Sequence, residues 1–218
     1  LPAGELKLGA IDTLDVTDSG GASMAVTTYA LSGIDLNPSY FALDEAGMLF
    51  ASMNERFALV RTGFEQEEQR LRDLAAEYAT RRFESIQENV TLVFDKPVRI
   101  NNVRVFDPDS LSLTDPVSVL VEDNQIVSMD DVVETADADE ILIDGAGGTL
   151  VAGMFEMHAH AGQGSALLNI AAGVTSFRDM GNNNAVLDDL INKIESGRLV
   201  GPRIHRSGFI EGRSPFNS

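Results

Sequence analysis

The fold of this protein is decided by residues 149–160, which read Thr-Leu-Val-Ala-Gly-Met-Phe-Glu-Met-His-Ala-His. Residues 149–155 form an apolar run that predicts a β-strand over residues 149–157, and side chains alternate between the two faces of a strand. His158 and His160 should therefore point the same way from the end of that strand. Two imidazoles on one side of a strand end can bind one metal ion, and imidazole suits zinc, iron or nickel.

The alternative is that these histidines are ordinary surface or core residues, which is the commoner case for two histidines close in sequence. The context favours ligands, because the chain has only 3 His and two of them fall here. The pair also stands after an apolar strand and before the glycine-rich stretch Ala161-Gly162-Gln163-Gly164.

The sequence around and after the two histidines resembles the amidohydrolase superfamily of metal-dependent hydrolases. Residues 153–160 (GMFEMHAH) are similar to the first-strand signature of that family, residues 171–181 (AAGVTSFRDMG) to its second strand, and residues 201–204 (GPRI) follow in the expected order. The resemblance implies a (β/α)8 barrel in which both histidines hold a catalytic metal at the C-terminal mouth. The Arg-Asp-Met-Gly version of the second strand looks most similar to the imidazolonepropionase and Xaa-Pro dipeptidase branch.

Composition excludes several classes of function. The net charge is −18, from 34 acidic and 16 basic residues, so we expect no nucleic-acid partner and no anionic membrane surface. No run of 18 apolar residues indicates a membrane span. Residues 1–5 lack the basic start and apolar core of a signal peptide, which leaves open a signal that was removed or that lies upstream. Without Cys, the chain has no disulfides or thiolate ligands. The compartment stays open between periplasm, secretion and cytoplasm.

Periodicity divides the chain into three predicted segments. Residues 1–89 should form an accessory antiparallel β unit with a long helix, residues 90–149 a small β-sandwich, and residues 150–218 the first three βα units of a TIM barrel. The fold class is thus α/β with an all-β or α+β N-terminal part, and the barrel is incomplete because three strands cannot close it. We expect the chain to be a fragment of a longer protein.

The individual elements follow from the same patterns. We expect strands at 24–31, 40–43, 48–51, 90–94, 98–106, 118–122, 125–129, 149–157, 174–177 and 203–207, and helices at 65–88, 165–172 and from 182–184 to 197.

The predicted metal ligands are His158 and His160. The family resemblance implies further metal ligands on later strands of the barrel, and this sequence does not contain those strands. The implied ligands are a carboxylated Lys or a Glu, two more His, and an Asp that also acts as general base. Asp179 is the one catalytic candidate. The favoured alternative is that Asp179 has a structural role, either as a cap or in an ion pair with Arg178. For His205 we favour a structural or loop role over ligation. We expect a divalent metal, zinc, with one or two ions in the parent protein.

Two functions are compatible with these observations. The first is a metal-dependent hydrolase that cleaves a C–N bond of a small amide, cyclic amide or dipeptide through a metal-activated water, and that is inactive as this fragment. The second is a non-catalytic binding or assembly module. We also expect a homo-oligomer or association with the missing half of the barrel, because incomplete barrels expose strand edges.

Overall fold

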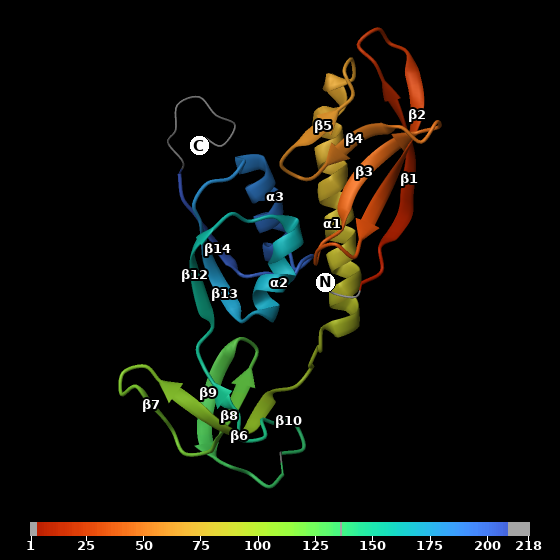
Figure 1. The fold of residues 1–218 in the computed structure, drawn as a ribbon. Coiled ribbons are helices and arrows are strands. Elements are labelled where there is room, and N and C mark those ends of the chain that lie inside the picture. Colours follow the sequence, from red (N-terminus) through yellow and green to blue (C-terminus); the bar gives the residue numbers. More distant parts are fainter. Residues whose placement is uncertain (1–3, 136, 209–218) are drawn as a thin grey trace. The chain divides into compact units, whose positions relative to one another are not determined.

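The computed structural model describes residues 4–135 and 137–208 (Figure 1). The chain divides into two compact units, one made of residues 90–154 and the other of residues 1–89 together with 155–218. The described part is mostly β-sheet, with a few helices. The division into three segments at residues 89 and 149 stays a prediction.

The N-terminal part of the first unit is an antiparallel meander. Its strands pair in chain order: β1 Lys7–Thr17, β2 Ser23–Ser32, β3 Ser39–Asp44, β4 Leu49–Met53 and β5 Ala58–Val60. Two aspartates make the tight turns, since Asp18 accepts the N–H groups of Gly20 and Ala22, and Asp44 those of Ala46 and Met48. The predicted strand at 24–31 and the predicted hairpin at 40–51 are confirmed.

One long helix covers this sheet. A short 3-10 turn, η1 Glu65–Glu67, leads into α1 Glu68–Val90, which confirms the helix predicted at 65–88. Leu71, Ala75 and Tyr78 are spaced three or four residues apart, so they share one face of α1 and pack against Val26 and Phe50 of the sheet. Burying this face stabilises both layers.

The strand predicted at residues 90–94 is wrong. Helix α1 continues through Val90, and residues 91–94 have no regular structure. Leu92 and Val93 are 76% and 88% exposed, so neither side chain packs against a neighbouring strand or a core. Without such packing, their apolar character does not stabilise a strand here.

The second unit is built from short strands. They are β6 Val98–Asp107, β7 Ser112–Leu113, β8 Val117–Glu122, β9 Gln125–Asp131, β10 Ile141–Asp144 and β11 Thr149–Leu150. The sheet order is β10-β6-β8-β9, with β7 and β11 also paired to β6. The strands predicted at 98–106, 118–122 and 125–129 are confirmed, and their packing as a two-layer sandwich stays a prediction.

The continuous strand predicted at residues 149–157 is wrong in its extent. It is split into β11 and β12 Met154–Ala159, with residues 151–153 outside any strand. The physical reason is that β11 pairs with β6, whereas β12 pairs with β13. The two halves belong to different sheets, so the chain must leave one ladder before it enters the next.

Strands and helices alternate in the rest of the first unit. β12 is followed by η2 Gln163–Ser165, α2 Ala166–Ala171, β13 Val174–Asp179, α3 Asn184–Glu195 and β14 Arg203–Arg206. The sheet order is β12-β13-β14, and β13 and β14 run parallel. Asn183 caps α3 by accepting the N–H of Ala185 at 3.0 Å. These elements confirm the helices and the last two strands predicted after residue 160.

The core of this region includes a residue from α1. Phe83 packs in one cluster with Phe177 of β13 and with Leu187 and Leu190 of α3. Helix α1 therefore contributes to two cores, one with the meander and one with the β12-β13-β14 region. No helix of the described residues combines the length and the hydropathy needed to cross a membrane.

Candidate metal centre

His158 and His160 lie together at the end of β12. His158 is in the strand, which ends at Ala159, and His160 is the next residue. Both side chains are exposed. Their ring centroids are 5.3 Å apart and the ring planes are inclined at 71°. The geometry thus brings the two predicted ligands side by side.

The ring of His160 is oriented by a backbone carbonyl. Its Nδ1 lies 2.7 Å from the oxygen of Gly181, just after β13. A carbonyl oxygen can only accept, so Nδ1 carries the proton and donates. In the neutral imidazole this leaves the lone pair of Nε2 free, which is the arrangement in which metal-binding histidines are commonly held.

The carboxylate nearest in sequence to the pair is Glu156. It stands two residues before His158, on the same side of a regular strand. Its Oε1 accepts the backbone N–H of His158 at 2.8 Å. Within residues 4–135 and 137–208, no three His, Cys, Asp or Glu side chains gather closely enough to hold a metal ion. A metal ion held here would therefore have only the two imidazoles as ligands from these side chains, and their role as ligands stays a prediction.

Asp179 ends β13 and is almost fully buried, with 1% of its surface exposed. Its Oδ2 accepts the N–H of Ala161 at 2.7 Å and the side-chain amide of Asn182 at 3.1 Å, and its Oδ1 accepts the N–H of Gly181 at 3.0 Å. Arg178 instead donates through Nε to the carbonyl of Met157 at 3.1 Å. Asp179 thus ties together the segments that carry and orient His160, and a catalytic role for it stays a prediction.

The third histidine lies elsewhere on the sheet. His205 is exposed in β14, where it pairs in register with Arg178 of β13. In the described part of the chain, no hydrogen bond joins His205 to His158 or His160.

Sequence reasoning missed the residues of the meander that hold the histidine segment. Arg56, between β4 and β5, donates from Nη2 to the carbonyls of His160 at 2.6 Å and Ala161 at 3.1 Å. Asn37 donates from Nδ2 to the carbonyl of Gly164 at 2.9 Å. These contacts join residues more than a hundred positions apart, and no local pattern in the sequence could have indicated them.

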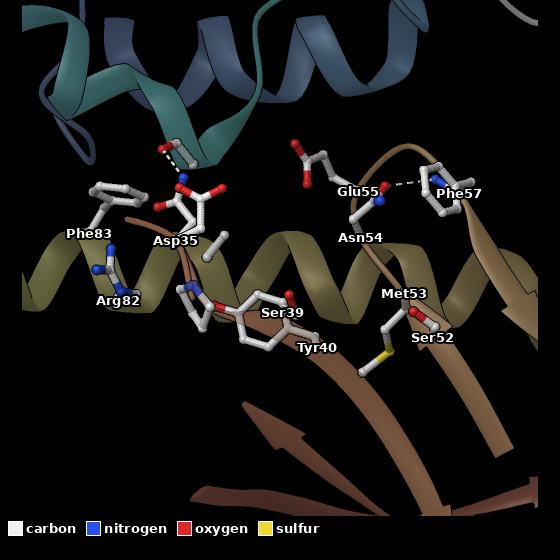
Figure 2. A pocket seen from close by; sticks show the side chains of 14 residues that line it. Asp35, Ser39, Tyr40, Ser52, Met53, Asn54, Glu55, Phe57, Arg82 and Phe83 are labelled. Atoms are coloured by element: carbon white, nitrogen blue, oxygen red, sulfur yellow. Dashed lines mark hydrogen bonds between the residues drawn. The ribbon is translucent and has the colours of Figure 1, made fainter. Parts of the chain in front are cut away.

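Two cavities lie beside this segment. One, of about 330 Å³, is drawn in Figure 2, where Glu55 and Phe57 come from the β4–β5 loop and Arg82 and Phe83 from α1. The other, of about 350 Å³, is lined by residues of α1, α3 and Gln163. Glu55 lines both, and a Cβ added at Gly162 would lie 2.3 Å from its Oε1. Only glycine therefore allows the β4–β5 loop to approach so closely without a shift of Glu55.

Comparisons with known proteins found no matching family model and no matching curated protein. Among solved structures, one assigned as a prolidase from Bifidobacterium longum is 22% identical, with a TM-score of 0.48 over 55% of this chain and 33% of that chain. A Xaa-Pro dipeptidase with methionine in its active site is 23% identical, with a TM-score of 0.47 over 51% and 33%. Molinate hydrolase is 19% identical, with a TM-score of 0.48 over 57% and 33%.

This chain spans about a third of the length of the structures that it resembles. A further structure, described as an amidohydrolase, is 23% identical, with a TM-score of 0.44 over 51% of this chain and 31% of that chain.

Proposed function

We propose that this chain is part of a metal-dependent hydrolase of the amidohydrolase superfamily, in which His158 and His160 are metal ligands. The observation that carries the proposal is the hydrogen bond from His160 Nδ1 to the Gly181 carbonyl, which leaves Nε2 free beside the ring of His158. Histidines that bind a metal commonly donate their other ring N–H to a backbone carbonyl in this way.

The chemistry of such a site divides between the metal and the chain. A bound divalent metal, which we propose to be zinc, supplies an acidified water and polarises the scissile carbonyl. The residues of this chain hold the two imidazoles in place. Asp179 fixes the N–H groups of Ala161 and Gly181, and Gly181 in turn orients the His160 ring.

We propose that β12, β13 and β14 are the first strands of a (β/α)8 barrel. Two features support this: β13 and β14 run parallel with α3 between them in the chain, and His158 and Asp179 both stand at the C-terminal ends of their strands. Active-site residues of such barrels lie at that end of the strands. The substrate would be a small amide, cyclic amide or dipeptide, as the sequence resemblance implies.

Further strands or a second copy of the chain would cover β12. Phe155 and Met157 on this strand are 68% and 54% exposed, which leaves apolar surface that favours association. We therefore propose a homo-oligomer or a barrel completed by other strands. Sedimentation of the 218-residue chain tests this, and a dispersed monomer in moderate salt would contradict it.

The alternative function is a non-catalytic binding or assembly module, in which the histidines hold no metal. Metal analysis of the longest natural form of the protein separates the two functions. His158→Ala with His160→Ala should remove most of the bound metal and nearly all amide hydrolysis, because a chelating pair is lost. His205→Ala is the matched control and should keep both. A protein that folds, but has no stoichiometric metal before any substitution, would exclude the hydrolase.

The 218-residue chain alone offers a second measurement. Two imidazoles leave most of the coordination sphere to water, so we propose weak or no zinc binding by this chain. Tight, stoichiometric zinc in equilibrium dialysis would contradict this and would indicate a third ligand.

A further inference from the structure

The cavity of about 350 Å³ between α1, α3 and the segment after His160 has the size of a small-ligand site. All its lining residues belong to the unit made of residues 1–89 and 155–218. Neither His158 nor His160 lines it, and the proposed hydrolase function does not use it.

A fully buried glutamine in this cavity has an unused acceptor. Gln163 has 0% of its surface exposed, and its Nε2 donates to Asp189 Oδ2 at 2.6 Å. A carboxylate only accepts, so this bond assigns the amide nitrogen and leaves Oε1 as the free atom. Oε1 is buried and has no hydrogen-bond partner among the described residues. A buried acceptor left unpaired is unfavourable, so the site favours a molecule that donates.

The charges around the cavity favour a cation. Each basic side chain that lines it lies within ion-pair distance of a carboxylate, although Arg72 Nε makes no hydrogen bond. Asp73 and Glu55 have no ion-pair partner among residues 4–135 and 137–208, and Asp73 accepts a hydrogen bond from Gln69 Nε2 at 2.7 Å. The pairs are Arg72 Nε with Glu68 at 2.9 Å, Lys193 Nζ with Asp189 at 2.6 Å, and Arg198 with Glu77 at 3.1 Å. The net charge of −18 adds to this preference by attracting cations to the surface as a whole.

We propose that this cavity binds a small molecule with a protonated amine, whose N–H groups donate to Gln163 Oε1 and to the carboxylate of Asp73. An ammonium group is suited to both, since it has three donors and no acceptor. The volume is larger than a bare metal ion needs and leaves room for a short carbon chain. The proposal does not depend on metal binding or hydrolysis.

The test is a titration of the 218-residue chain with n-butylammonium, followed by the NMR signal of the Gln163 side-chain amide. Butyltrimethylammonium is the matched probe, because it has the charge but no N–H donor. We expect saturable binding of n-butylammonium with a dissociation constant on the order of 1 mM, as suits so small a ligand. Butyltrimethylammonium should bind at least about tenfold more weakly, since it cannot form the charge-assisted hydrogen bonds.

Two variants complete the test. Asp73→Asn keeps the size of an exposed side chain and should weaken n-butylammonium binding by about tenfold, whereas Glu195→Gln on α3, outside the cavity, should leave it unchanged. Gln163→Leu should abolish binding, and Asp73→Asn decides if that buried variant fails to fold. Equal, unsaturable shifts with both probes, or a long-lived water at Gln163 that the amine does not displace, would overturn the proposal.

Discussion

Arg56 holds the backbone of His160. Its Nη2 donates to the His160 carbonyl at 2.6 Å and to the Ala161 carbonyl at 3.1 Å, so a loop of the meander fixes the segment that carries a proposed metal ligand. This relationship gives the N-terminal region a physical role in the site, although it contributes no proposed ligand.

Replacing Arg56 with Ala should therefore loosen the histidine segment. Two carbonyls lose a charged donor, which should lower the free energy of unfolding by about 1–3 kcal/mol. Hydrogen exchange of the amides at residues 161–165 should also become faster. Urea unfolding and hydrogen exchange of the 218-residue chain measure the two effects.

Arg61→Ala is the matched control for this prediction. Arg61 also donates to a carbonyl, that of Leu49 at 2.9 Å, and pairs with Asp44, but both partners lie within the meander. It should lower stability without a selective change at residues 161–165. Unchanged exchange there in Arg56→Ala would show that the contact does not order the segment.

Asp179→Asn should destabilise the same segment from the other side. The substitution replaces one of the two accepting carboxylate oxygens of Asp179 with an NH2 group, which donates. The backbone N–H of either Ala161 or Gly181 then loses its acceptor next to a buried side chain. We expect a loss of about 1–3 kcal/mol in the free energy of unfolding. Asp188→Asn, exposed on α3, is the control and should stay within about 0.5 kcal/mol of the original protein. Equal stability of the two variants would contradict the role given to Asp179.

Local patterns in the sequence predicted most of the elements correctly. The helix at 65–88 was predictable because Leu71, Ala75 and Ala79 repeat at the helical period, and the aspartate turns marked the hairpins. The region after residue 160 was predictable because strands and helices alternate with clear capping residues such as Asn183.

The errors arose where tertiary pairing decides the structure. Residues 90–94 have strand-forming side chains but no strand beside them, and residues 149–157, predicted as one strand, serve two sheets. At the candidate site, the sequence predicted His158 and His160 but not the partners that orient them. Arg56 donates to the backbone carbonyl of His160, and His160 donates to the backbone carbonyl of Gly181. Every residue has a backbone carbonyl, so neither contact can be recognised from the identity of the accepting residue.

The second unit should lose stability in acid through Glu140. Arg99 donates from Nε to Glu140 at 2.6 Å and from Nη1 to Asp130 at 3.0 Å. The hydrogen bond from Arg99 lowers the pKa of Glu140 below its ordinary value. A carboxyl whose pKa is depressed by folding stabilises the folded state above its unfolded pKa, and this contribution is lost as the pH falls through the folded value.

Glu140→Gln tests this by its pH dependence. The variant should be less stable than the original protein at about pH 7. The difference should shrink as the pH falls below 4.5, the ordinary pKa of glutamate, and through the lowered pKa of Glu140 in the folded state. Urea unfolding of the second unit at neutral and at acid pH measures the difference. Glu134→Gln, which is exposed, is the control, and a difference for Glu140→Gln that stays constant with pH would contradict the pairing.

Tyr78 should make the meander sensitive to alkali. Its hydroxyl lies 2.8 Å from Thr28 Oγ1 in the core between α1 and β2, and burial raises the pKa of Tyr78 to about 12. A group whose pKa is raised by folding adds stability below its unfolded pKa, near 10, and this contribution is lost as the pH rises through the folded value.

Tyr78→Phe loses the hydrogen bond and should be about 1 kcal/mol less stable at neutral pH. Above pH 10 its deficit should shrink, because phenylalanine cannot ionise. Thr28→Val is the control for the pH dependence. It removes the same hydrogen bond, together with the two that join Thr28 Oγ1 to the backbone of Asp12, but it keeps the phenol and therefore the alkaline loss. Urea midpoints at increasing pH measure all three proteins, and a Tyr78→Phe deficit that does not narrow in alkali would show that this phenol ionises freely in the folded state.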